Sequence, residues 1–238
     1  VCTKLYFSME NLILQQFFVF TFPERHDKMC SYLYFSFLRG QTMDSNFFAL
    51  ISRMRYIARW GLMRNALPEN IQEHSHMVAV LAHALGVIRR DIFHQPCDVN
   101  ALATAALYHD ASEILTGDLP TPIKYHNAEI MSAYHAVEDL AVQKLLGMLP
   151  PELRETYADV LAEDKAGDIY PLVKAADKLS AYIKCIEERK AGNNEFLSAE
   201  AQTRAALEAS PLPEVQYFLE HFIPAFERDL DELGAIGQ

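Results

Sequence analysis

Residues 107–113 hold the side chains best suited to chemistry, because His109 and Asp110 are adjacent and Glu113 follows one helical turn later. The Ala- and Leu-rich run before them, residues 100–106, favours a helix that ends near His109. His109 would then lie on the buried face of this helix, and Glu113, four residues further on, would share that face. Buried imidazole and carboxylate groups cost free energy unless something compensates them, and a bound divalent cation does so. The segment therefore predicts a metal site inside a helical protein.

A second histidine, His74, could supply another ligand. Asn70 and Glu73 have the spacing of a capping box, which predicts that a helix begins just before His74. One continuous buried face follows along this helix, made of His74, Val78, Leu81, Leu85 and Ile88. His76 falls on another face. A lone histidine in such a stripe is more often a hydrogen-bonded core residue than a ligand, and His74 becomes a candidate ligand because His109 needs partners.

A fourth candidate ligand, Asp177, lies on a helix predicted over residues 169–189. The buried stripe of this helix is Leu172, Ala176, Leu179, Ile183 and Ile186, and Asp177 flanks it. An acidic residue at the edge of a stripe is often only solvated or paired with a lysine, here Lys174 or Lys178. Combined with the other candidates, however, it completes an H…HD…D pattern spread over separate helices.

This set of two imidazoles and two carboxylates has a definite chemical preference. A mixed nitrogen and oxygen ligand set suits a borderline divalent ion such as Mn²⁺, Co²⁺, Fe²⁺, Ni²⁺ or Zn²⁺. Four protein ligands leave positions open for water and for a substrate oxygen, as catalytic sites require. Such an ion lowers the pKa of its bound water and neutralises charge on a phosphoryl group. The pattern therefore predicts a catalytic metal site.

The elements that must position these residues are all predicted to be helices. One helix, capped by Asp44 or Ser45, is predicted before the His74 helix. The helix that leads to His109 is predicted after the His74 helix, with Asp98 as its N-cap. Residues 116–122 are rich in turn formers and predict a loop that either lines the pocket or simply connects two helices. Later helices are predicted over residues 127–148, 152–161, 196–209 and 213–233. Period-two alternation is too short for strands, so we predict an all-α, single-domain helical bundle.

Composition narrows the function. The chain has 238 residues, 50% of them hydrophobic and 22% charged, and a net charge of −11 without a block of Lys or Arg. This balance disfavours binding to a nucleic-acid polymer. No stretch approaches the roughly 18 apolar residues of a membrane span, so no membrane association is expected. The four cysteines lack paired spacing, which is typical of a reducing compartment such as the cytoplasm.

Residues 1–42 differ from the rest. They carry two of the four cysteines and an aromatic-rich run, residues 17–22, but no pattern of a signal peptide. We interpret them as an N-terminal extension upstream of a natural start at Met43, rather than as a working part of the protein. The domain is therefore predicted to cover residues 43–238. Mass spectrometry of the natively expressed protein would decide, because peptides from before Met43 would contradict this interpretation.

The H…HD…D pattern resembles the HD-domain superfamily of metal-dependent phosphohydrolases. Five further segments are similar to the bacterial HD-domain 5′-deoxynucleotidases, the YfbR-like family: Arg59-Trp60, residues 73–75, residues 108–113, residues 115–122 and residues 192–196. The resemblance covers about residues 43–233 and leaves residues 1–42 unmatched. It implies a cytoplasmic homodimer that hydrolyses 2′-deoxyribonucleoside 5′-monophosphates to deoxynucleoside and phosphate with one divalent metal ion, such as Co²⁺ or Mn²⁺.

The resemblance also implies roles for individual residues. The metal ligands would be His74, His109, Asp110 and Asp177, and all of these except His109 would also contact the substrate. Arg59 would orient the phosphate, for which its planar guanidinium is suited. Glu113 would position or deprotonate the attacking water, and Asp118 would contact the substrate and protonate the leaving oxygen.

On the sugar side, the resemblance implies that Trp60 packs where a 2′-hydroxyl would sit and so disfavours ribonucleotides. Leu119, Pro120 and Thr121 would complete the substrate loop. Spacing alone instead favours Trp60 as an aromatic residue packed at the rim of the core beside a solvated arginine.

Two alternatives remain open. The chain could be an HD phosphohydrolase that acts on a triphosphate, a cyclic nucleotide or a phosphodiester. Triphosphates would require more basic residues than Arg59, Arg64 and Lys124 near the pocket. The chain could also be a catalytically silent nucleotide-binding helical module, but the complete ligand set together with Glu113 argues against this.

Overall fold

Helices make up the architecture of the part of the chain that the computed structural model describes, residues 45–124, 126–161 and 167–234, with Thr121 and Pro122 described by their backbone alone. The predictions about residues 1–42 and Met43 lie outside the described residues. The longer helices are α4 (Ile71–Val87), α5 (Val99–Tyr108), α8 (Ala128–Gly147), α9 (Pro151–Leu161), α10 (Tyr170–Lys190), α11 (Leu197–Glu208) and α12 (Pro213–His221). The short ones are α3 (Phe47–Ile51), η2 (Ser52–Tyr56), η3 (Ile88–Ile92), α6 (Glu113–Thr116), α7 (Thr121–Lys124), η4 (Asn194–Phe196), η5 (Ile223–Glu227) and α13 (Leu230–Gly234).

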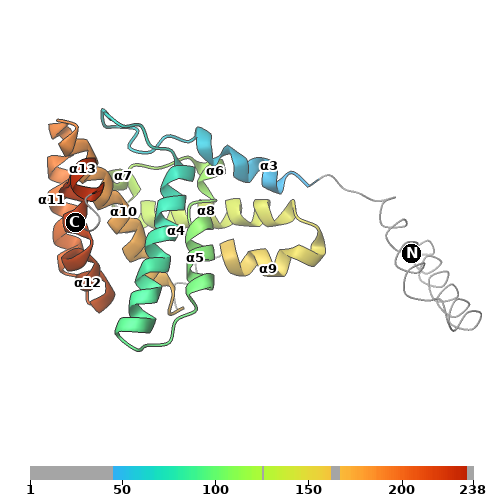
Figure 1. Cartoon of the computed structure of the whole chain (residues 1–238). Helices are drawn as coiled ribbons and strands as arrows, with labels where there is room; N and C mark the ends of the chain where they lie inside the picture. The colour runs from blue at the N-terminus through green and yellow to red at the C-terminus, as the bar shows by residue number, and fades with distance from the viewer. Residues whose placement is uncertain (1–44, 125, 162–166, 235–238) are drawn as a thin grey trace, which may run out of the picture. The chain divides into compact units, whose positions relative to one another are not determined.

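The centre of the described region is formed by α4, which packs against α5 and α10 (Figure 1). The predicted stripes of α4 and α10 are both buried in this core, which confirms the helical periodicity of the two segments. Helices α11 and α12 cover α10 and α4 from the other side. The candidate ligands thus lie on α4, on α10 and in the turn that follows α5, next to this centre.

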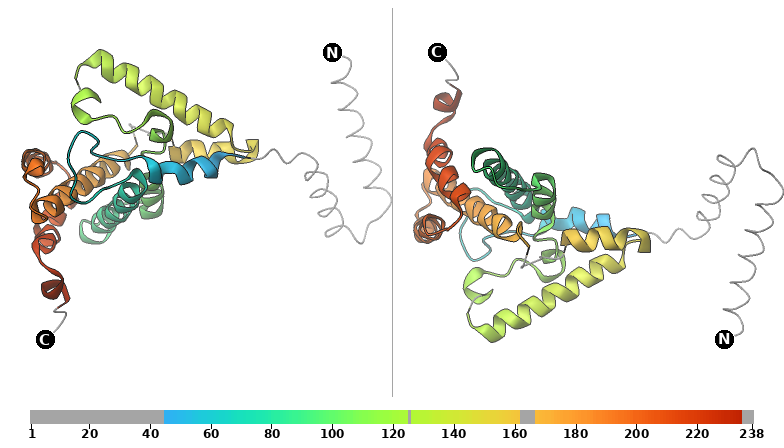
Figure 2. Two further views of the ribbon diagram at one scale, coloured as in Figure 1. Left: turned by 90° about the horizontal axis from the view of Figure 1, so that it is seen from above. Right: turned by 90° about the horizontal axis from the view of Figure 1, so that it is seen from below.

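A second, smaller apolar cluster joins α3 to the hairpin of α8 and α9 (Figure 2). Its buried members are Phe47, Ala111, Leu145, Leu146, Leu149 and Leu161. Ala111 is fully buried there and follows Asp110 directly. Packing of this cluster therefore holds the turn that carries the candidate ligands His109 and Asp110.

The start of α4 confirms the predicted capping box. Asn70 Oδ1 accepts a hydrogen bond from the Glu73 amide at 3.1 Å, and Glu73 Oε2 accepts one from the Asn70 amide at 3.3 Å. The side chain of Asp98 likewise caps α5. Because the capping box fixes the first turn of α4, it also fixes the backbone of His74.

Replacing Asn70 with alanine is expected to lower the free energy of unfolding by about 0.5–2 kcal/mol, because the Glu73 amide at the start of α4 loses the side-chain oxygen that accepts its hydrogen bond. Urea denaturation followed by circular dichroism measures this. Asn70→Ser keeps an acceptor oxygen and should recover most of the loss. An unfolding midpoint that is equal in Asn70→Ala and the parent protein would contradict the importance of this cap.

Three sequence predictions need correction. Helix α3 begins after Asn46 rather than after Ser45, whose hydroxyl donates to the Met148 carbonyl at 2.7 Å and accepts only a long hydrogen bond from the Phe47 amide, at 3.5 Å. The first helix also changes to a 3₁₀ turn, η2, at Ser52. The helix predicted over 213–233 ends at His221 and continues as η5 and α13, because Pro224 lacks the amide that an α-helix needs.

The apolar face of α8 is only partly buried. Tyr134, Ala141 and Leu145 lie in contact with neighbouring helices, whereas Val137 is 49% exposed and Leu140 71% exposed. In the described part of the chain, helix α8 packs mainly against α6, α7 and α9, so its wide stripe is covered along one side.

No strand occurs among the described residues, and the only β-type pairing in that region is an isolated bridge between Ala58 and Asn70. The described helices include none that is both long and apolar enough to cross a membrane. The all-α prediction is confirmed.

Candidate metal centre and active site

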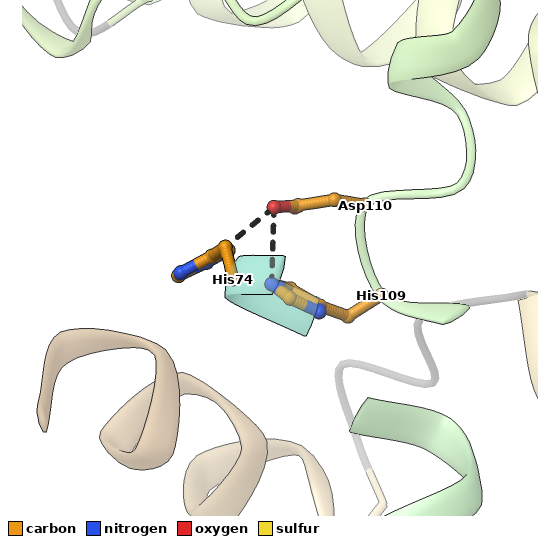
Figure 3. A group of neighbouring side chains, drawn as sticks. All are labelled: His74, His109 and Asp110. Atoms are coloured by element: carbon orange, nitrogen blue, oxygen red, sulfur yellow. Dashed lines mark ion pairs between the residues drawn. The ribbon is translucent and has the colours of Figure 1, made fainter. Parts of the chain in front are cut away.

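Three of the four candidate ligands converge at one point. His74 projects from the first turn of α4, while His109 and Asp110 lie in the turn that follows α5 (Figure 3). Their ligand atoms all lie within 4.8 Å of one another, which could hold a metal ion. Asp110 Oδ2 is 3.2 Å from His109 Nε2 and 3.6 Å from His74 Nε2.

Asp177 reaches the same place from α10. Its Oδ1 lies 3.1 Å from His74 Nε2, although it is not part of the tightest group of three. The residue at the edge of the α10 stripe thus points toward the histidines. The structure therefore brings all four predicted ligands to one centre, contributed by α4, α10 and the turn after α5.

The two imidazoles are oriented for a cation. His109 Nδ1 lies 2.8 Å from the Ala106 carbonyl, which only accepts, so this nitrogen carries the proton and the neutral ring has its lone pair on Nε2. His74 Nδ1 pairs with Ser180 Oγ at 3.2 Å. In the described part of the chain, neither Nε2 has a hydrogen-bond partner, and both are buried. Two buried nitrogens left without hydrogen bonds beside two carboxylates fit a divalent cation.

Electrostatics keep the carboxylates in their charged form. Burial opposes ionisation of Asp110, but His109, His74 and Arg59 outweigh it and lower its pKa below the ordinary value. Burial likewise opposes ionisation of Asp177, and His74 and His109 lower its pKa. Metal ligation requires deprotonated carboxylates, so the site meets this condition.

Glu113 lies beside the ligands, on a different helix from the one predicted. Helix α5 ends at Tyr108, residues 109–112 form a turn, and Glu113 starts α6, so the shared helical face of His109 and Glu113 was wrong. The side chain is nevertheless buried, and its Oε2 lacks a hydrogen-bond partner among the described residues. Burial, together with Asp110 and Asp118, raises the pKa of Glu113 far above its ordinary value.

Asp118 follows α6 and is half-buried near the same charges. Burial and the charge of Asp110 raise its pKa, while Arg59, His74 and Lys124 act in the opposite direction. A raised pKa favours the protonated carboxyl, which can donate a proton.

Arg59 and Trp60 enter the centre from the loop before α4. Arg59 Nη1 lies 3.3 Å from Asp110 Oδ2, and its Nε donates to Glu69 Oε2 at 3.2 Å. The indole Nε1 of Trp60 donates to the same Glu69 oxygen at 2.9 Å. One carboxylate oxygen therefore holds the guanidinium and the indole side by side.

The predicted substrate loop begins as a loop and then becomes helical. Leu119 and Pro120 are half-buried, and the Pro120 carbonyl accepts the amides of Ile123 and Lys124 at 2.8 and 3.1 Å. Thr121 opens α7, and its side chain lies outside the described part of the structure.

Two charged residues near the centre had no predicted role. Glu69 lies in the loop before α4, and no periodicity links a loop residue to Arg59 ten positions earlier. Lys124 was counted as a basic residue near the pocket; its Nζ pairs with Glu138 Oε1 at 2.9 Å and lies 4.4 Å above the Tyr134 ring. Such contacts depend on the packing of α7 against α8, which local sequence does not encode.

The sequence of this chain matches a known protein family. The family model described as 5′-deoxynucleotidase YfbR-like matches residues 46–226. The chain belongs to the YfbR-like family. Its YfbR-like relatives include the 5′-deoxynucleotidases YfbR of Shigella boydii and Escherichia coli, each 50% identical over 192 residues, which is 80% of this chain and 96% of the relative.

A solved structure shows the same fold. An HD-domain phosphohydrolase of Listeria innocua superimposes with a TM-score of 0.68 at 24% identity, covering 76% of this chain and 88% of that one. The predicted YfbR-like family, the helical HD-domain fold and the class of metal-dependent phosphohydrolase are therefore confirmed. The roles of the individual site residues stay predictions.

Proposed function

We propose that the chain is a metal-dependent 5′-deoxynucleotidase, which hydrolyses 2′-deoxyribonucleoside 5′-monophosphates to deoxynucleoside and inorganic phosphate. The observation that carries the proposal is the convergence of two buried, unpartnered imidazole nitrogens and two carboxylates beside Arg59. Membership of the YfbR-like family supports the choice of substrate.

One divalent ion is proposed to be held by His74, His109, Asp110 and Asp177. When bound, it would neutralise charge on the phosphate and lower the pKa of a water molecule. The ligand set accommodates Co²⁺ or Mn²⁺ as well as other borderline ions.

Chain residues are proposed to handle the phosphate and the protons. Arg59 binds the phosphate oxygens, because a guanidinium pairs with two oxygens at once. Glu113 accepts a proton from the attacking water as the new P–O bond forms. The bond between phosphorus and the 5′-oxygen breaks, and Asp118 donates a proton to that oxygen, so the nucleoside leaves as an alcohol.

The sugar side is proposed to be formed by Trp60 and the loop of Leu119, Pro120 and Thr121. An indole packed against C2′ of deoxyribose leaves no room for a 2′-hydroxyl. His74, Asp110 and Asp177 would contact the substrate as well, because they surround the position where the phosphate binds.

The arrangement of basic residues favours a monophosphate over a triphosphate. Of the three basic residues expected near the pocket, Arg64 is 94% exposed and pairs with Glu195 in solvent. Lys124 is already paired with Glu138, which leaves Arg59 as the group beside Asp110. One guanidinium together with a metal suits one phosphoryl group better than three.

The same proposal includes a cytoplasmic location and a homodimer, both implied by the family resemblance. The two cysteines in the described region, Cys97 and Cys185, are free thiols, as a reducing compartment would leave them. Light scattering during size-exclusion chromatography tests the dimer, since a mass of a single chain would contradict it.

The decisive experiment strips the full-length protein of metal and measures phosphate release from dAMP, AMP and dATP after Co²⁺ or Mn²⁺ is added. We expect metal-dependent release from dAMP, roughly 10- to 100-fold faster than from AMP and dATP. Equal release from dATP would favour a triphosphate hydrolase. Binding of metal without release from any nucleotide would favour a catalytically silent module.

A further inference from the structure

Trp60 adopts a backbone conformation that a bulky residue rarely occupies. Its φ is +58°, in the left-handed region that glycine tolerates. Such a conformation costs free energy and persists only where the surroundings determine it. The contacts of Trp60 therefore indicate what holds it.

The indole is held on two sides. Its ring lies 5.2 Å from the ring of Phe196, centroid to centroid, at an interplanar angle of 58°, and Phe196 is fully buried. Its Nε1 donates to Glu69 as described above. The Trp60 carbonyl also accepts the Met63 amide at 2.9 Å, which closes the turn after it.

The turn that carries Phe196 also binds the loop that follows Trp60. Asn193 Nδ2 donates to the Arg64 carbonyl at 2.6 Å, and Glu195 Oε1 accepts the Arg64 amide at 3.3 Å. Gly192, at a φ of +84°, lets the chain leave α10 and reach this position. Residues 192–196 were recognised in the sequence as a family-like segment without a role.

A buried charged residue near the end of α10, Glu188, also binds the loop that follows Trp60. Glu188 is fully buried and accepts the amides of Ala66 and Leu67 at 2.8 and 3.0 Å, as well as Asn193 Nδ2 at 2.7 Å. Lys184, also buried, pairs with Glu188 and donates to the Leu67 carbonyl. Burial opposes ionisation, but these donors lower the pKa of Glu188 to about 2, so it stays charged.

We infer that Phe196 and Asn193, with Glu188 beneath them, are positioning residues for Trp60 and thereby set the preference for deoxyribose over ribose. This inference rests on the proposed function. A rigid indole rejects an added hydroxyl because the surroundings cannot yield, whereas an indole that can shift makes room for it. Specificity would therefore be supported by residues about 130 positions away in the sequence, which contact Trp60 and the loop that follows it.

The test compares Phe196→Leu and Asn193→Ala in the full-length, metal-loaded protein. We expect the ratio of kcat/KM for dAMP to that for AMP to fall roughly 3- to 10-fold in each, the scale of one lost aromatic contact. Two matched controls should leave the ratio unchanged: Phe218→Leu, a buried phenylalanine of the central core, and Asn194→Ala, the exposed neighbour of Asn193.

A second readout does not depend on activity. Trp60 is the only tryptophan, so all tryptophan fluorescence reports this site. In Phe196→Leu and Asn193→Ala we expect lower anisotropy and emission at longer wavelength, with neither change in the controls. An unchanged substrate ratio in folded variants would overturn the inference, as would unchanged fluorescence. Failure of the parent protein to hydrolyse dAMP would instead contradict the proposed function, and the fluorescence comparison would still test whether Phe196 holds Trp60.

Discussion

Replacing Asp110 with alanine is expected to remove the metal and to lower kcat/KM for dAMP by on the order of 10³-fold or more. The loss should exceed the 10- to 100-fold effect typical of residues that only support metal ligands. Asp110 Oδ2 lies 3.2 Å from His109 Nε2 and 3.3 Å from Arg59 Nη1, so the substitution deletes one proposed ligand and also releases the guanidinium. Both effects weaken the binding of phosphate.

Metal content after dialysis and the rate of dAMP hydrolysis measure this effect together. Asp139→Ala removes an exposed aspartate from α8 and serves as the control, expected to keep metal and rate. Asp110→Asn keeps the shape of the side chain and removes its charge, so it should also lose metal. An Asp110→Ala protein that retains stoichiometric metal and near-normal turnover would exclude Asp110 from the ligand set.

Helical periodicity predicted most of the candidate metal centre. The stripes of α4 and α10 are buried as expected, and a residue on or beside such a stripe has a defined direction. Spacing therefore placed His74 on a buried face and Asp177 at the edge of one. That these residues lie together with His109 could be predicted only from the pattern of four residues, because each residue alone has a more ordinary explanation.

The surroundings of Trp60 could not be predicted in the same way. Its left-handed backbone has no sequence signature, since the residue is not glycine. Its partners Glu69 and Phe196 lie in a loop and in a turn, where no period relates one residue to another. The contact with Phe196 joins segments that are far apart in the sequence, so it belongs to the tertiary structure.

The errors in helix boundaries have the same origin. Glu113 was expected to share a helical face with His109, yet the chain turns at residues 109–112, where fully buried Ala111 packs into the cluster shared with α3 and α8. Tertiary packing there outweighs the local preference for a continuous helix. The turn nevertheless places Glu113 beside Asp110. The two residues are therefore close together, although Glu113 does not share a helical face with His109.

Replacing Glu113 with glutamine is expected to leave metal binding intact and to lower kcat for dAMP by roughly two to four orders of magnitude, the usual contribution of a general base. Glutamine has nearly the same shape but cannot accept a proton from water. Burial, together with the charges of Asp110 and Asp118, raises the pKa of Glu113, so it can act as a base only where nearby positive charge favours its ionised form.

The measurement must separate proton transfer from metal and substrate binding. Metal content and the quenching of Trp60 fluorescence by dAMP should match the parent protein, while turnover falls. Glu155→Gln, on the exposed side of α9, is the matched control and should be unaffected in all three. If turnover in Glu113→Gln stayed within about tenfold of the parent, Glu113 would have no role as a base. If metal were lost as well, Glu113 would belong with the ligands, and proton transfer would have to be assigned to another group.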